Sequence, residues 1–186
     1  MTFEREELIN LIKKNISLKQ IDLSEIPDID LYMDQVTTFM EDKLKEFKRT
    51  KEDKILTKTM INNYTKNKIL PPPEKKKYSK DHMMLLILIY HLKQILSIGD
   101  IHSLLSSVSD ISIENLYKNF TDIQSIECKN FSEEMPKKID ELQKQIHPNE
   151  ENFDKLTLFS MIFFLIIQSS LEKRLAEKLI DTFFND

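Results

Sequence analysis

One glycine in 186 residues constrains the fold of this chain more than any other sequence feature. Tight turns and hairpins rely on glycine for positive φ, so a protein built from many short strands needs far more of it. Apolar residues make up 40% of the chain, which is enough for a hydrophobic core. The sequence therefore predicts an all-α, mainly helical fold, as one domain or one small domain with an extension.

The spacing of apolar side chains predicts where the longer helices lie. Apolar residues recur at intervals of three and four, the period of a helix with one buried face. The long C-terminal segment is very apolar in its first half and amphipathic in its second half. We expect helices over residues 3–16, 29–47, 80–96 and 153–184.

Local capping signals predict three helix starts. Thr57 can accept a hydrogen bond from a first-turn N–H of a short helix over residues 58–67. Ser79 is suited to begin the helix that follows at Lys80. Ser97, with Asp100 three residues later, has the spacing of a capping box.

The segment 112–145 keeps helical spacing but contains Pro136. Proline removes a backbone donor and clashes with the preceding turn of a helix. We expect either one long helix or two shorter ones, with a break or kink near residue 135.

Two apolar runs, Met83–Leu92 and Leu156–Ile167, are shorter than the roughly 20 residues that cross a bilayer. We expect both to be buried helices and expect no membrane association. The N-terminal segment is charged from residue 4 onward, unlike a signal peptide. The single cysteine, Cys128, excludes an intramolecular disulfide and fits a reducing compartment, so a cytoplasmic location is expected.

Charge is distributed unevenly along the chain. Residues 43–80 hold 13 Lys or Arg and 4 Asp or Glu, a net charge of +9. The rest of the chain has a net charge of −13. A basic segment on an acidic body favours a surface that meets a polyanion, although a solvated lysine-rich loop also gives this pattern.

The order of elements across this basic segment resembles the DNA-binding domain of the MerR family. The stretch "NNYTKNKILPP" matches the end of that family's recognition helix at Tyr64, Ile69, Leu70 and Pro71. Two further motifs match: "YSKD" at Tyr78, Ser79 and Asp81, and "LSIGDI" at Leu96, Ser97, Ile98 and Ile101. The whole chain also resembles an uncharacterised bacterial family known only as a domain of unknown function with such a domain at its front.

The resemblance covers about residues 29–108 and implies a winged helix-turn-helix. We therefore expect an N-terminal helix and connector over 1–28 and a DNA-binding domain over 29–108. A helical module over 109–186 would serve dimerisation or bind an effector. The pattern departs from the family at Asn62, where the family has arginine, and at Lys68, where it has glycine. Lysines also replace a Gly-Tyr-Arg in the wing.

The function expected from these features is sequence-specific DNA binding by a transcriptional regulator. The recognition helix, about residues 58–67, would enter the major groove, and the wing, residues 74–78, would lie on phosphates. Asparagine pairs with adenine through two hydrogen bonds, whereas lysine neutralises phosphate. The expected DNA-binding residues are Lys58, Thr59, Asn62, Asn63, Lys66, Lys68, Lys75, Lys76, Lys77 and Tyr78.

Other functions have less support in the sequence. It has no glycine-rich phosphate loop, no HExxH motif and no cysteine–histidine cluster, so we expect no enzyme activity, cofactor or metal. Double-stranded DNA and a second copy of the chain are the expected partners. A small-molecule effector held among methionine and phenylalanine side chains is left open. The alternative function is a helical protein–protein interaction module that has lost DNA binding, which the departures at Asn62 and in the wing favour.

Overall fold

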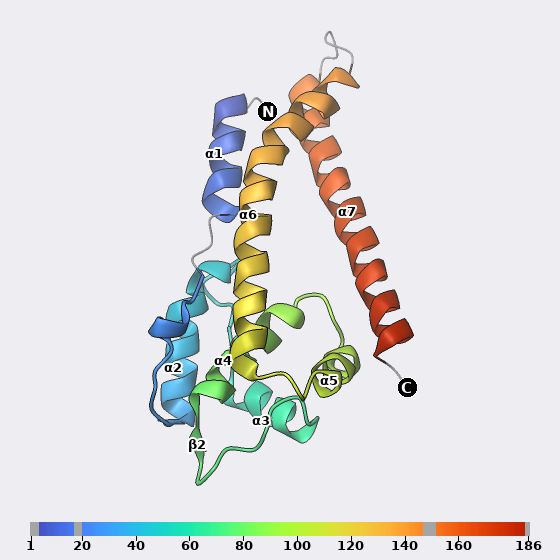
Figure 1. Cartoon of the computed structure of the whole chain (residues 1–186). Helices are drawn as coiled ribbons and strands as arrows, with labels where there is room; N and C mark the ends of the chain where they lie inside the picture. The colour runs from blue at the N-terminus through green and yellow to red at the C-terminus, as the bar shows by residue number, and fades with distance from the viewer. Residues whose placement is uncertain (1–3, 17–19, 147–151, 185–186) are drawn as a thin grey trace. The chain divides into compact units, whose positions relative to one another are not determined.

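The computed structural model describes residues 4–16, 20–146 and 152–184, and it is mostly helical as expected (Figure 1). Short 3-10 turns cover Leu23–Glu25 and Lys45–Phe47. Two short strands, β1 (Leu31–Tyr32) and β2 (Lys77–Tyr78), form the small sheet. The helices are α1 (Arg5–Ile16), α2 (Met33–Leu44), α3 (Lys58–Lys66), α4 (Lys80–Leu92), α5 (Ile98–Ser107), α6 (Ile113–Lys144) and α7 (Phe153–Phe183).

The chain divides into two compact units, and each combines two stretches of sequence. The three-helix unit consists of Met1–Lys19 and Ile123–Leu175. The α2–α5 unit consists of Gln20–Asp122 and Ala176–Asp186. These limits differ from the sequence-based boundaries, because α1 groups with parts of α6 and α7 and the last residues group with α2–α5.

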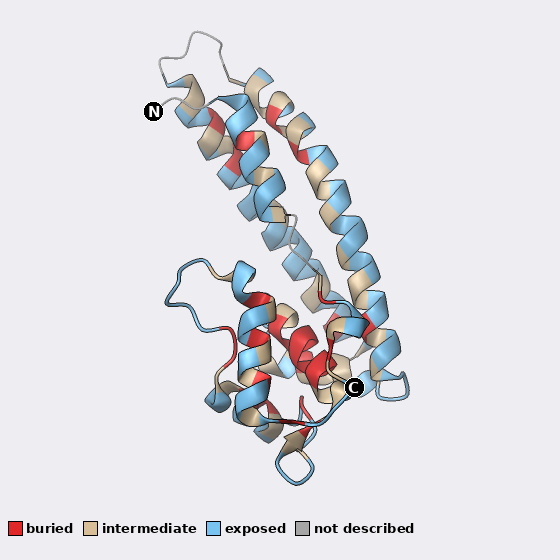
Figure 2. Ribbon diagram, turned by 90° about the vertical axis from the view of Figure 1, so that its left-hand side faces the viewer, coloured by how far each residue is buried: buried red, intermediate tan, exposed pale blue. Residues whose placement is uncertain are grey.

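Helix α4 is the centre of the α2–α5 unit. Every residue from Met83 to Tyr90 is buried, which confirms the prediction for the first apolar run (Figure 2). A helix that is apolar on all sides must be surrounded by other elements. Its core includes buried side chains from α2, α3, α5 and the end of α7, among them Val36, Met40, Ile61, Ile101 and Ile180.

Two of the three predicted caps form the expected side-chain hydrogen bonds, whereas α4 begins at Lys80 as expected with the Ser79 N–H donating to His82 Nδ1 at 3.1 Å. The Met60 N–H donates to Thr57 Oγ1 at 3.1 Å, at the start of α3. Ser97 and Asp100 form the expected reciprocal pair at the start of α5, with N–O distances of 3.1 and 3.0 Å. Both caps depend only on residues three positions apart, so they can be recognised without tertiary information.

The two strands tie the basic segment to the start of α2. β1 and β2 are antiparallel, with Leu31 opposite Tyr78 and Tyr32 opposite Lys77. Both β2 and α3 pack on α2. The segment between α3 and α4 is therefore anchored at each end to the same helix.

The three-helix unit has a small core made by Leu8, Met135, Ile139 and Met161. An exposed ion pair adds to it, because the Arg5 guanidinium donates two hydrogen bonds of 2.8 Å to the Asp140 carboxylate. The guanidinium lowers the pKa of Asp140 through these bonds.

Of the two alternatives for this segment, the single long helix is observed: α6 runs from Ile113 to Lys144 with Pro136 inside it, so the chain does not divide into two helices near residue 135. Met135 and Ile139 on either side of the proline are buried in the core of the three-helix unit. Because the residues around Pro136 are held in this core, the helix continues although the proline has no N–H to donate.

The prediction that Leu156–Ile167 is buried is wrong. Most of its apolar side chains are exposed, and only Met161 is buried, with Leu158 and Phe164 partly buried against the same core (Figure 2). Among the described residues, α7 is the one helix long and apolar enough to cross a membrane. Its most apolar 18-residue window has a mean hydropathy of 1.4 and is 11% buried.

Candidate nucleic-acid interface

Helix α3 has a buried face and an exposed polar face. Ile61 and Tyr64 are buried in the core of the α2–α5 unit, with Met60 partly buried beside them. At 100° per residue, the remaining side chains of the helix point the other way. The structure leaves five of the predicted DNA-binding residues exposed there: Lys58, Thr59, Asn62, Asn63 and Lys66.

The end of α3 places Lys68 in an unusual backbone conformation. The Ile69 N–H donates to the Tyr64 carbonyl and the Lys68 N–H donates to the Thr65 carbonyl, each at 3.1 Å. This pair of bonds is the Schellman motif, which requires the left-handed conformation at its penultimate residue. That residue is Lys68, with φ of 61°. Glycine normally occupies this position because it has no Cβ to strain.

A tight turn before β2 presents two more lysines. The Lys77 N–H donates to the Glu74 carbonyl at 2.8 Å, and both central residues, Lys75 and Lys76, have positive φ (48° and 66°). These features match a type I′ hairpin turn, which favours Asn-Gly. Both lysines are exposed at the tip.

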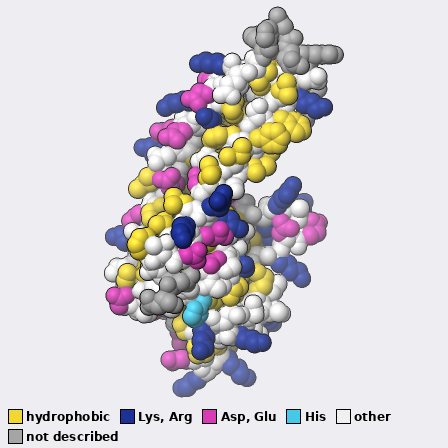
Figure 3. Space-filling view, turned by 90° about the vertical axis from the view of Figure 1, so that its right-hand side faces the viewer, with side chains coloured by type: hydrophobic (Ala, Val, Ile, Leu, Met, Phe, Trp, Pro, Cys, Tyr) yellow, Lys and Arg dark blue, Asp and Glu magenta, His cyan; other side chains and the backbone are white. Residues whose placement is uncertain are grey.

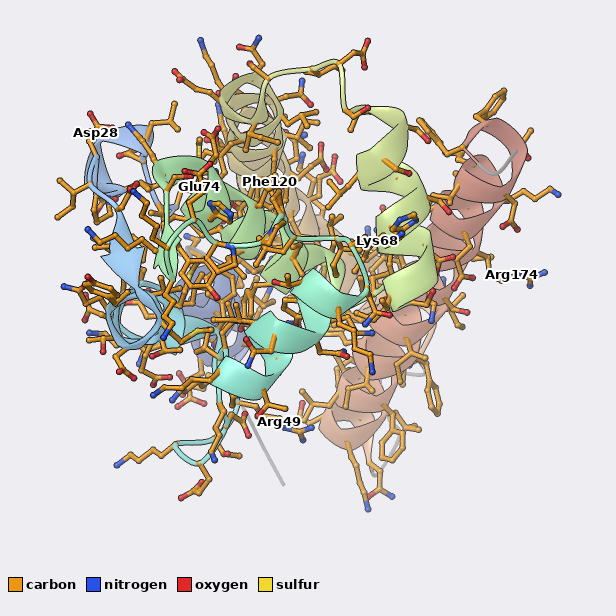
Figure 4. All side chains as sticks on the ribbon, turned by 90° about the horizontal axis from the view of Figure 1, so that it is seen from below. Asp28, Arg49, Lys68, Glu74, Phe120 and Arg174 are labelled. Atoms are coloured by element: carbon orange, nitrogen blue, oxygen red, sulfur yellow. The ribbon has the colours of Figure 1, made fainter. Side chains whose placement is uncertain are left out.

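Figure 4 labels Lys68 after α3 and Glu74 at the start of the turn. Among the described residues, the non-glycine positions with positive φ are these three lysines. Each belongs to the predicted interface, and a lysine in the left-handed region costs on the order of 1 kcal/mol more than glycine. The strain therefore coincides with the predicted phosphate-binding positions.

Three of the predicted residues, Lys58, Lys77 and Tyr78, contact other side chains of the unit. Lys58 forms an ion pair with Asp34 at the start of α2. The Lys77 ammonium lies 5.3 Å from the centre of the Tyr32 ring, a cation–π distance. Tyr78 differs from the rest of the set, because its side chain is 3% exposed and packs in the core. We therefore leave Tyr78 out of the interface proposed below.

Sequence reasoning missed Asp34 and Tyr32 as neighbours of the basic residues. They lie 24 and 45 positions before Lys58 and Lys77 in the chain. The β1–β2 pairing brings Tyr32 to Lys77, and neither residue carried a local signal of that pairing.

Two groups outside this surface, His91 and Cys128, have pKa values shifted by burial. His91 is enclosed by aromatic rings, with centroid distances of 4.9 Å to Phe47 and 5.2 Å to Phe120. Burial lowers the pKa of His91 to about 4, so the ring is neutral at pH 7. Burial also raises the pKa of the Cys128 thiol, which disfavours the reactive thiolate. Across the parts of the chain that the structure describes, no three His, Cys, Asp or Glu side chains gather as metal ligands would.

One cavity includes methionine and phenylalanine side chains in its lining. It lies in the three-helix unit, has a volume of about 510 Å³ and includes Phe131, Met135 and Phe164 in its lining. Charged side chains, among them Lys138 and Glu141, form much of the rest. It is thus less apolar than a typical small-molecule pocket.

Comparison with known protein families assigns the chain to one family. The sequence profile of DUF1836, a domain of unknown function, matches residues 21–120, more than half of its length. The chain belongs to the DUF1836 family. The expected likeness to a family with a domain of unknown function is thereby confirmed. No curated protein and no solved structure matches the chain.

The DUF1836 match covers α2–α5 and the whole candidate interface. All ten predicted DNA-binding residues lie within it, as do Asp34 and Tyr32. It excludes α1, most of α6 and all of α7. The candidate interface therefore lies entirely within the part of this chain that matches DUF1836.

Proposed function

We propose that this DUF1836 protein is a cytoplasmic DNA-binding transcriptional regulator with a MerR-like winged helix-turn-helix. In this proposal α2 and α3 form the helix-turn-helix, and residues 74–78 form the wing. The exposed face of α3 lies in the major groove, as the second helix of this motif does in known complexes. Asn62 and Asn63 read adenine edges there.

The observation that carries the proposal is the position of Lys68, Lys75 and Lys76. All three occupy left-handed backbone positions at which glycine or asparagine would be more stable. Strained residues persist where the side chain is needed for function. Exposed lysines beside an exposed polar helix face are the side chains that phosphate neutralisation requires.

The charge pattern supports the same assignment. The interface lies within the segment of net charge +9, while the rest of the chain is acidic. An acidic body beside a basic surface orients the approach of a polyanion, because only one face attracts it.

Fluorescence anisotropy on a mixed-sequence duplex, from low to physiological salt, tests phosphate binding. The variant is Lys75→Asn/Lys76→Gly, which removes two charges and installs the preferred type I′ turn residues. We expect weaker binding and a log–log salt slope shallower by about 2, at roughly 0.9 per lost phosphate contact. The matched control is Lys13→Asn/Lys14→Gly, which removes two exposed charges from α1 of the other unit.

An equal loss of affinity in both variants would mean that overall charge, and not the wing, governs binding. Absence of binding by the native protein at low salt would overturn the proposal and favour the interaction-module alternative. If binding occurs, an operator selected from genomic DNA tests base reading. There, Asn62→Ala should lower affinity by about 1–3 kcal/mol and relax the preference at one base pair.

A further inference from the structure

Helix α7 carries two apolar stripes on opposite sides within the three-helix unit. Leu158, Met161 and Phe164 lie on one side and join the core made with α1 and α6. A second set of apolar residues recurs at i, i+3, i+4 and i+7, the spacing of a helix face that packs against another element. We call this set the outer stripe: Phe159, Ile162, Phe163 and Ile166.

The outer stripe is exposed although its composition is that of a core. Its four side chains are between 49% and 60% exposed, whereas Met161 on the opposite side is 5% exposed. The Phe159 and Phe163 rings contact each other with centroids 5.7 Å apart. Figure 3 looks onto α7 and shows hydrophobic side chains gathered along it. Soluble monomers rarely leave so large an apolar patch in water.

We propose that the outer stripe is the contact surface for a second copy of this chain, as a two-fold dimer. Three flanking apolar residues, Leu156, Ile167 and Leu171, are 40–61% exposed and extend the patch. With about 200 Å² per fully exposed side chain of this size, the seven residues offer roughly 700 Å². A stable specific interface removes about 800 Å² from each partner, so the patch has the required size.

Charge favours a second copy over a lipid surface. No Asp, Glu, Lys or Arg occurs between Leu156 and Leu171, so two copies of the stripe can meet without repulsion or unpaired charges. The sequence of the three-helix unit holds 11 basic and 12 acidic residues. Helices that lie on anionic membranes instead surround the apolar face with lysine and arginine. A neutral, self-complementary stripe is suited to an isologous interface.

The purpose of this dimer rests on the proposed function, because operators recognised by helix-turn-helix dimers present two half-sites. The dimer itself is tested without DNA. The full chain is examined by sedimentation equilibrium, where twice the chain mass of 22.1 kDa is expected. Ile162→Glu/Ile166→Glu should weaken dimerisation by about 100-fold, because unpaired charges would be buried at the centre of the interface.

The matched control is Leu11→Glu, which adds a charge at another exposed apolar residue of the same unit. It should remain dimeric, and circular dichroism should show all variants equally helical. A monomeric native protein, or a double variant that stays dimeric, would overturn the proposal. Flotation of the native monomer with phosphatidylcholine–phosphatidylglycerol vesicles would assign the stripe to membranes instead. A native dimer that loses self-association only in the double variant, yet fails to bind DNA, would support this surface and refute the proposed function alone.

Discussion

At the scale of a single residue, the backbone conformation at Lys68 favours glycine, whereas an exposed positive charge at this position requires lysine. Its backbone closes α3 in the left-handed conformation, where a Cβ is unfavourable. The resemblance to the MerR family pointed to glycine at this position. In this structure the position has positive φ, which glycine adopts without strain, whereas the lysine present here adds an exposed cation.

Lys68→Gly should raise the free energy of unfolding by about 0.5–1 kcal/mol, because the left-handed penalty exceeds the extra chain entropy of glycine. The same variant should bind DNA more weakly, with a salt slope shallower by about 1. Urea unfolding and anisotropy measure the two effects. The control is Lys66→Gly, two residues earlier within α3, which should lower stability by about 1 kcal/mol. A loss of stability in Lys68→Gly would contradict the strain assigned to this residue.

At the scale of an element, α6 keeps a proline within 32 helical residues. Pro136→Ala restores a backbone donor and removes a clash with the preceding turn. We expect the free energy of unfolding to rise by about 1–2 kcal/mol. This is part of the roughly 3 kcal/mol by which alanine stabilises a helix interior relative to proline. Urea denaturation followed by circular dichroism measures the change. Reduced stability would show that packing of Met135 and Ile139 depends on the proline.

Helix starts could be predicted from the sequence where they depend on residues close together in the chain. Thr57 and Ser97 were recognised as caps because the bonds they make are local. The sequence left one or two helices open around Pro136 and wrongly predicted burial for Leu156–Ile167, because both outcomes depend on what packs against the helix. For the candidate interface, the exposed face of α3 followed from helical spacing. The burial of Tyr78 did not, because it depends on the pairing of Tyr78 with Leu31, 47 positions earlier in the chain.

At the scale of the whole molecule, His91 links stability to pH. Its pKa is about 4 in the folded protein and about 6.5 when unfolded, so the unfolded chain binds the extra proton in between. Stability from this group is therefore complete above pH 6.5 and falls as the pH drops toward 4, by up to about 3 kcal/mol. Urea unfolding at several pH values measures this loss. His91→Phe should flatten the curve in that window, and an unchanged curve would contradict the assignment.

Neither unit is a continuous stretch of sequence, and this affects how the protein is made. Ile180 belongs to the same core as α4, although it comes 58 residues after Asp122 and 53 of those residues, Ile123–Leu175, belong to the other unit. A ribosome adding about 5–20 residues per second takes roughly 3 to 12 seconds to cover that distance. During translation, the core around the apolar helix α4 therefore stays incomplete until the last residues of the chain have been synthesised. A fragment limited to the family match at residues 21–120 would permanently lack Ile180 and the other core contacts made by the end of α7.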